Sequence, residues 1–161
     1  MEIKTVFLIQ FFFSLTVYAL IAKWFVSPWL TKKATDAALI LLILPHAFRH
    51  VGMAFLVPNL NPGPIAEPFA TTAAYGDLAA AVFAIVAIIA LRGGWTFKYA
   101  VVWVFSIVGT VDFANALSRG EALPYFGATW FIPAMFVPLL LVSHFLIFVR
   151  LLAKNKKPIA S

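Results

Sequence analysis

The stretch DAALILLILPHAFRHVGMAFLV, residues 36–57, decides the fold of this chain. It is long and apolar enough to cross a bilayer, and its interior carries His46, Arg49 and His50. A membrane-spanning helix needs about 20 mainly apolar residues. Stretches of the same kind lie at residues 6–26, 69–91, 96–117 and 129–152. The sequence therefore predicts an all-α integral membrane protein, a bundle of five transmembrane helices that forms a single domain over residues 1–161.

The composition excludes most soluble classes of protein. Of the 161 residues, 63% are hydrophobic and 11% are charged, whereas about 25% of residues are charged in an average globular chain. Five spans would leave about 50 residues for tails and loops, too few for a domain outside the membrane. The chain has no cysteine, which excludes disulfides, thiolate metal sites and cysteine nucleophiles.

The distribution of Lys and Arg predicts the orientation of the bundle. If the N-terminus is outside, nine of these residues fall on the inner side, and only Lys4 and Arg119 fall on the outer side. Because positive residues concentrate in cytoplasmic loops, we expect the N-terminus outside and the C-terminus inside, in a multi-pass protein of the bacterial cytoplasmic (inner) membrane. The net charge of +6 then reflects topology and affinity for membrane lipids, not for nucleic acid.

Polar residues inside the spans define a candidate site. Each ionisable residue costs about 2.5–3.5 kcal/mol at the centre of a span, so each suggests a function. In an α-helix His46, Arg49 and His50 share one face, and a rise of 1.5 Å per residue brings them to the depth of polar residues in two other spans. We expect one cluster in the outer half of the bilayer, completed by Tyr75, Asp77, Asp112 and Asn115.

Charge and chemistry suggest a role for each residue of this cluster. Arg49 is permanently charged, so two ionised aspartates would leave a negative sum that a shared proton would cancel. We assign His46, His50 and Asp77 as catalytic candidates that exchange this proton. Arg49, with the group Tyr75, Asp112 and Asn115, would bind the polar head of a ligand.

Three functions remain open on the sequence alone. The first is binding of a small lipophilic molecule, such as an isoprenoid, a sterol-like lipid or a quinone, with acid–base turnover as an extension of it. The second is a redox subunit for a quinone or a b-type haem, the haem being held by His46 and His144, although His144 comes out about 8 Å deeper than His46. The third is a non-catalytic accessory subunit, in a homo-oligomer or a larger membrane complex, whose polar cluster only fixes helix register. The cofactor remains unknown.

The orientation can be tested by labelling. Single cysteines at Asn61, in the loop after the second span, and at Lys156, in the C-terminal tail, should differ in intact cells. An impermeant thiol reagent should label position 61 and leave position 156 unlabelled. The opposite result would reverse the predicted orientation.

Overall fold

The structure, a computed structural model, describes residues 1–58, 60 and 67–155, and within these residues it contains helices and turns but no strand. Five segments are long and apolar enough to cross a membrane, which indicates a multi-pass membrane protein and agrees with the five predicted spans. The helical elements, in chain order, are α1 (Ile3–Ile21), η1 (Ala22–Val26), α2 (Ser27–Thr31), α3 (Thr35–Ile43), η2 (Leu44–Leu56), α4 (Glu67–Arg92), α5 (Lys98–Leu117), η3 (Gly120–Tyr125), η4 (Gly127–Trp130), η5 (Ile132–Phe136) and α6 (Val137–Asn155).

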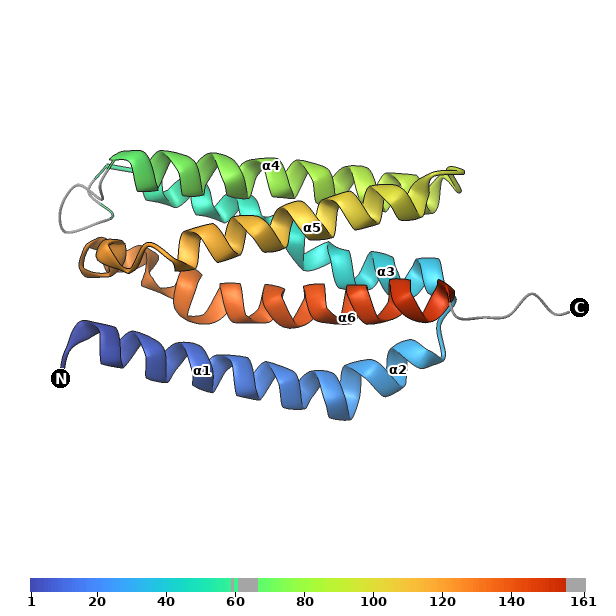
Figure 1. Ribbon diagram of the computed structural model, residues 1–161, viewed down its shortest axis with the longest axis horizontal. Coiled ribbons are helices and arrows are strands. Elements are labelled where there is room, and N and C mark those ends of the chain that lie inside the picture. The colour runs from blue at the N-terminus through green and yellow to red at the C-terminus, as the bar shows by residue number, and fades with distance from the viewer. Residues whose placement is uncertain (59, 61–66, 156–161) are drawn as a thin grey trace, which may run out of the picture.

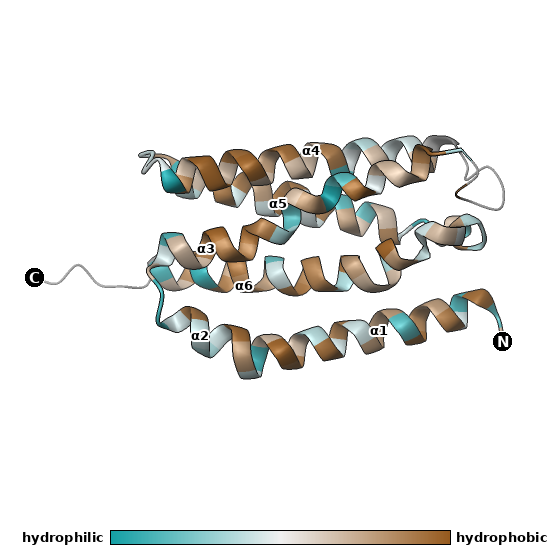
Figure 2. Ribbon diagram, turned by 180° about the vertical axis from the view of Figure 1, so that it is seen from behind, coloured by the Kyte–Doolittle hydropathy of each residue, from teal (hydrophilic) through white to brown (hydrophobic). Residues whose placement is uncertain are grey.

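The long helices lie side by side and roughly antiparallel (Figure 1). The continuous segment α3–η2 packs chiefly against α4, which also packs against α5, while α6 contacts both α3 and α5. α1 lies at one edge of this group and packs against α6, η5 and η3. Hydrophobic residues dominate every long helix (Figure 2), as expected for helices whose outer faces contact lipid.

The first helix runs further than the sequence suggested. We expected Ser27-Pro28 to end it, but the helix continues through Pro28 to Thr31. A π turn, η1, precedes the proline. A proline removes one backbone hydrogen bond from a helix, and a wider π turn accommodates a local irregularity of this kind. The π turn therefore lies directly before the proline.

The second span changes its helical type at Pro45. Residues Thr35–Ile43 form an α-helix, and Leu44–Leu56 form a 3₁₀ helix of 13 residues. Pro45 has no N–H to donate, and hydrogen bonding then shifts from i−4 to i−3, so carbonyls at the junction lose their helical donors. The Ser143 hydroxyl of α6 donates to the carbonyl oxygen of Leu42 at 2.5 Å and thereby supports the junction.

The two ends of the bundle differ in charge. Lys4 and Arg119 lie at the end where α1 begins and α5 finishes, whereas most other Lys and Arg residues lie at the opposite end. At that opposite end Asp36 accepts hydrogen bonds from Lys98 Nζ at 2.5 Å and from Tyr99 Oη at 2.6 Å, which ties α3 to α5. The positions chosen for labelling, Asn61 and Lys156, lie outside the described residues, and the orientation in a membrane stays a prediction.

Candidate functional site

The 3₁₀ helix η2 selects which residues of the second span face the bundle. A 3₁₀ helix has three residues per turn, so residues three apart are eclipsed. His46, Arg49, Gly52 and Phe55 follow this spacing, and these four residues are the buried ones of η2. The period of three therefore directs one histidine and the arginine into the interior.

The expectation that His50 shares this face was wrong. His50 lies four residues after His46, which is one face of an α-helix but about 120° away in a 3₁₀ helix. Its side chain is exposed, and its Nδ1 lies 3.1 Å from the carbonyl oxygen of Ala47 in its own helix. In the described part of the chain, His50 therefore forms no hydrogen bond with Arg49 or His46.

Arg49 joins three helices. Its Nε donates to Asp77 Oδ1 of α4 at 2.8 Å, and its Nη2 donates to Asp112 Oδ2 of α5 at 2.5 Å. Nη2 also lies 2.7 Å from Asp77 Oδ1. Arg49 as a whole is 1% exposed, and its guanidinium carbon lies 3.8 Å from the centroid of the Phe113 ring. The predicted ion pair between Arg49 and an aspartate is confirmed, and the arginine binds both candidates at once.

Three glycines make room for this network. A Cβ atom at Gly52 would come within 2.7 Å of the Asp77 side chain, and one at Gly76 would meet the Asp112 carboxylate. A Cβ atom at Gly109 would lie 3.1 Å from Arg49 Nη1 and 2.7 Å from His144 Nε2. Each charged residue therefore packs against the bare backbone of a neighbouring helix.

His46 and His144 meet in the centre of the bundle, contrary to the expectation that His144 lies deeper. Their ring centroids are 4.1 Å apart. The earlier depth assumed a rise of 1.5 Å per residue, which puts His46 about 16 Å below Val57. The 3₁₀ rise of 2.0 Å moves it to about 22 Å, close to the depth of about 24 Å predicted for His144.

The histidine pair does not fit a haem. Two histidines that bind one haem must stand on opposite faces of the macrocycle, with iron between them. Rings whose centroids lie 4.1 Å apart are in contact, and the ring of Phe105 packs on both of them, at 5.1 Å from His46 and 5.3 Å from His144. The four ring nitrogens and the hydroxyl of Ser106 are buried, and none of them has a hydrogen-bond partner in the described chain.

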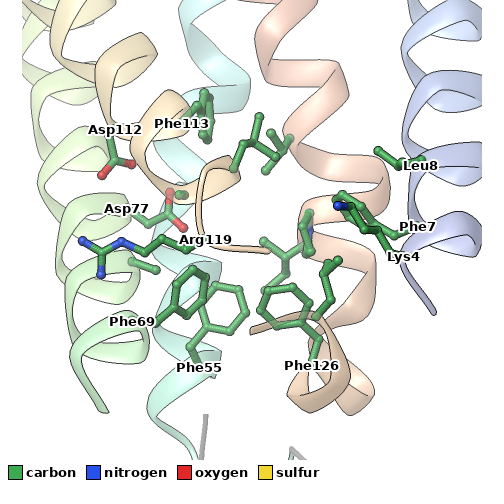
Figure 3. A pocket seen from close by; sticks show the side chains of 17 residues that line it. Lys4, Phe7, Leu8, Phe55, Phe69, Asp77, Asp112, Phe113, Arg119 and Phe126 are labelled. Carbon is green, nitrogen blue, oxygen red and sulfur yellow. The ribbon is translucent and has the colours of Figure 1, made fainter. Parts of the chain in front are cut away.

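A cavity of about 130 Å³ lies on the other side of the ion-pair network (Figure 3). Asp77 and Asp112 line it, whereas neither His46 nor His50 is among its lining residues. Five phenylalanines, two cations and small or aliphatic side chains complete the wall. Its lining residues are Lys4, Phe7, Leu8, Phe55, Phe69, Ala73, Asp77, Asp112, Phe113, Ala116, Leu117, Arg119, Leu123, Phe126, Ile132, Pro133 and Val137.

The remaining candidates lie away from this cavity, and the structure adds residues that the sequence did not suggest. Tyr75 is 56% exposed on the outer face of α4. Asn115 is exposed and lines only a smaller hollow beside Asp112. The glycines were overlooked, although each lies within three residues of a charged residue that joins the network, a spacing that could have identified them.

Removal of Arg49 should unfold the bundle far more readily than removal of another arginine. Arg49→Ala would leave two carboxylates partly buried without their counter-charge, and breaking a buried pair typically costs about 3–5 kcal/mol. Thermal unfolding of the purified protein in mild detergent measures this loss. Arg119→Ala is the control, because Arg119 forms no salt bridge among the described residues. Equal losses for the two variants would contradict the central role of Arg49.

Gly52→Ala should also destabilise the protein, although it only adds a methyl group. That methyl would collide with the Asp77 side chain, and overpacking of this kind costs about 1–3 kcal/mol. Val51→Ala, a change on the exposed side of the same helix, should shift the unfolding temperature much less. A Gly52→Ala variant as stable as the parent would show that η2 and α4 lie further apart than described.

Comparisons with known proteins identify the family of this chain. A search of curated proteins and a search of solved structures found no match. One family, described as Domain of unknown function (DUF8737), matches residues 6–152. This match includes most or all of each of the five apolar helices and every residue of the ion-pair network. The chain therefore belongs to the family described as Domain of unknown function (DUF8737).

Proposed function

We propose that this protein binds a small, largely apolar molecule in the cavity beside the Asp77–Arg49–Asp112 network. The observation that carries the proposal is the double role of the two carboxylates. Each accepts a hydrogen bond from Arg49 with one oxygen, and each also lines the cavity. The network thus supplies a fixed polar edge to an apolar space.

The size and lining of the cavity support binding. A cavity of about 150 Å³ in an apolar core can hold a benzene molecule, and this one measures about 130 Å³. Ligand sites are typically lined by hydrophobic and aromatic side chains with a few placed polar groups. This cavity has such a lining, because five phenylalanines surround it and Asp77 and Asp112 supply polar groups at one side.

The proposed roles follow from the contacts. Arg49 does not line the cavity, so it is a positioning residue that holds the carboxylates, in place of the head-group anchor expected from the sequence. Asp77 and Asp112 contact the polar head of the ligand. Of the three residues expected to be catalytic, only Asp77 lines the cavity, so we propose binding without turnover.

A purely structural role is the second candidate. It is favoured by the complete burial of Arg49 and by its bonds to two other helices, which would lock helix register in an accessory subunit of a larger complex or a homo-oligomer. Under that alternative the cavity is a packing defect that binds no ligand. A variant whose cavity is filled should then give the same probe signal as the parent protein.

We also propose the location of the protein. With nine Lys and Arg residues assigned to one side and two to the other, the positive-inside rule supports an N-terminus outside and a C-terminus inside, in a bacterial cytoplasmic membrane. In that orientation Lys4, Arg119 and the cavity belong to the outer half of the bilayer. Membrane lipids then surround the bundle as its general partners.

A bulky residue placed in the cavity should abolish binding. Ala116 lines the cavity, whereas Ala114 of the same helix is exposed. Ala116→Phe should weaken binding of the probe 4-fluorobenzyl alcohol at least tenfold, measured by ¹⁹F NMR as a bound signal separate from the detergent-dissolved one. Ala114→Phe should bind as the parent does. No bound signal in the parent protein, or equal signals in both variants, would favour the structural role.

A further inference from the structure

The cavity wall is unusually rich in aromatic rings. Phe55 of η2, Phe69 of α4 and Phe126, between η3 and η4, form a mutually packed trio with centroid distances of 5.5–6.0 Å. Phe7 of α1 and Phe113 of α5 contribute two more rings to the same cavity. Figure 3 shows the trio together below the two aspartates, with Phe7 on the side of α1. A ligand in this cavity would be surrounded by aromatic rings from several elements.

Aromatic rings attract cations as well as apolar groups. The face of a ring carries negative electrostatic potential, and aromatic cages are a known way to bind quaternary ammonium groups. Phe113 already accepts a cation, because the Arg49 guanidinium lies 3.8 Å from its centroid. Among the described residues, no Lys or Arg cation lies over the rings of the other four phenylalanines of the cavity.

The carboxylates make the inner part of the cavity acidic. Arg49 contributes one positive charge, and with both aspartates ionised the network has a net charge of −1. Oδ2 of Asp77 lies against Gly52 and Oδ1 of Asp112 lies against Gly76, and Arg49 bonds the other oxygen of each. One cation beside them would complete the charge balance, which matters in a medium where unpaired charge is costly.

Two cations stand nearer to the end of the bundle. Lys4 is in the first turn of α1, and Arg119 follows the last residue of α5 by two positions. Asp77 lies ten residues into α4, about 15 Å along its axis, so the carboxylates are deeper than the two cations. The cavity is therefore negative at its inner end and positive nearer the bundle end, and its rings extend from Phe113 beside the carboxylates to the trio at the bundle end.

We propose that the ligand is a zwitterionic quaternary ammonium compound, bound with its trimethylammonium group beside the carboxylates and the rings of Phe7 and Phe113, and with its phosphate or carboxylate group toward Lys4 and Arg119. This inference rests on the proposed binding function and names the ligand class for the same cavity. The volume of about 130 Å³ suits a group of trimethylammonium size, near that of the benzene molecule held by a 150 Å³ cavity. The rest of the ligand extends toward the bundle end.

The first experiment separates charge from shape. Choline and 3,3-dimethyl-1-butanol have the same outline, but only choline is charged. Isothermal titration calorimetry on the full chain in maltoside detergent should give at least tenfold tighter binding of choline. Phe7→Leu, which keeps an apolar side chain and removes a ring, should reduce this preference severalfold. Asp112→Asn should reduce it too, and the unfolding temperature of each variant shows whether it is folded.

The second experiment tests the positive end of the cavity. Phosphocholine should bind several times more tightly than choline, because its phosphate reaches Lys4 and Arg119. The double variant Lys4→Gln, Arg119→Gln should lose this advantage and keep its affinity for choline. Lys32→Gln, at the opposite end of the bundle, is the control and should change neither value. Lysophosphatidylcholine, compared with free phosphocholine, distinguishes a lipid headgroup from a soluble compound as the source of this chemistry.

The outcomes distinguish this inference from the function on which it rests. If the neutral alcohol binds as tightly as choline, the ammonium assignment is overturned while the apolar binding site stands. If choline binds best but phosphocholine gains nothing, the ligand is a simple cation and the zwitterion is overturned. If none of these compounds binds and 4-fluorobenzyl alcohol does not bind either, both proposals fail.

Discussion

The bond of Arg49 to two aspartates on two other helices is the constraint on which the interior of this bundle depends. A guanidinium away from water needs acceptors for its donors, and here the acceptors come from α4 and α5. The distance over which these groups can bond is short, so the helices must approach closely at one level. The glycines at that level satisfy this demand, and the charged network and the close packing are therefore one feature.

The sequence was sufficient for the helical class, for the five apolar helices and for part of the site. Length and hydropathy of the apolar stretches predicted five helices, and the charges of Arg49, Asp77 and Asp112 predicted an ion pair, because an isolated charge in a span is costly. Both predictions are confirmed. The placement of the histidines failed for one reason, the 3₁₀ form of η2. Pro45 signals a break in hydrogen bonding, but it does not reveal that the following 13 residues continue as a 3₁₀ helix.

The interior contains two polar regions of different character. The aspartates face a cavity, whereas His46 and His144 are sealed between η2, α5 and α6 with their ring nitrogens unsatisfied in the described chain. Buried polar groups without partners cost about 1–3 kcal/mol each, so the ring nitrogens of the histidines oppose the stability that ring packing supplies. Arg49 lies beside both regions, and Gly109 packs against both Arg49 and His144. The cavity and the histidine pair are thus adjacent but do not share a space.

The position of α1 has a consequence for the route to the cavity. α1 contributes Lys4, Phe7 and Leu8 to the cavity wall, yet it packs chiefly against α6, η5 and η3 and lies at the edge of the bundle. A wall formed by the most peripheral helix is the one whose displacement breaks the fewest contacts of the core. A ligand with an apolar part would then enter sideways from the hydrocarbon phase, where it is already concentrated by partitioning. Its occupancy would follow its mole fraction in the lipid, and the aqueous concentration would matter only through the partition coefficient.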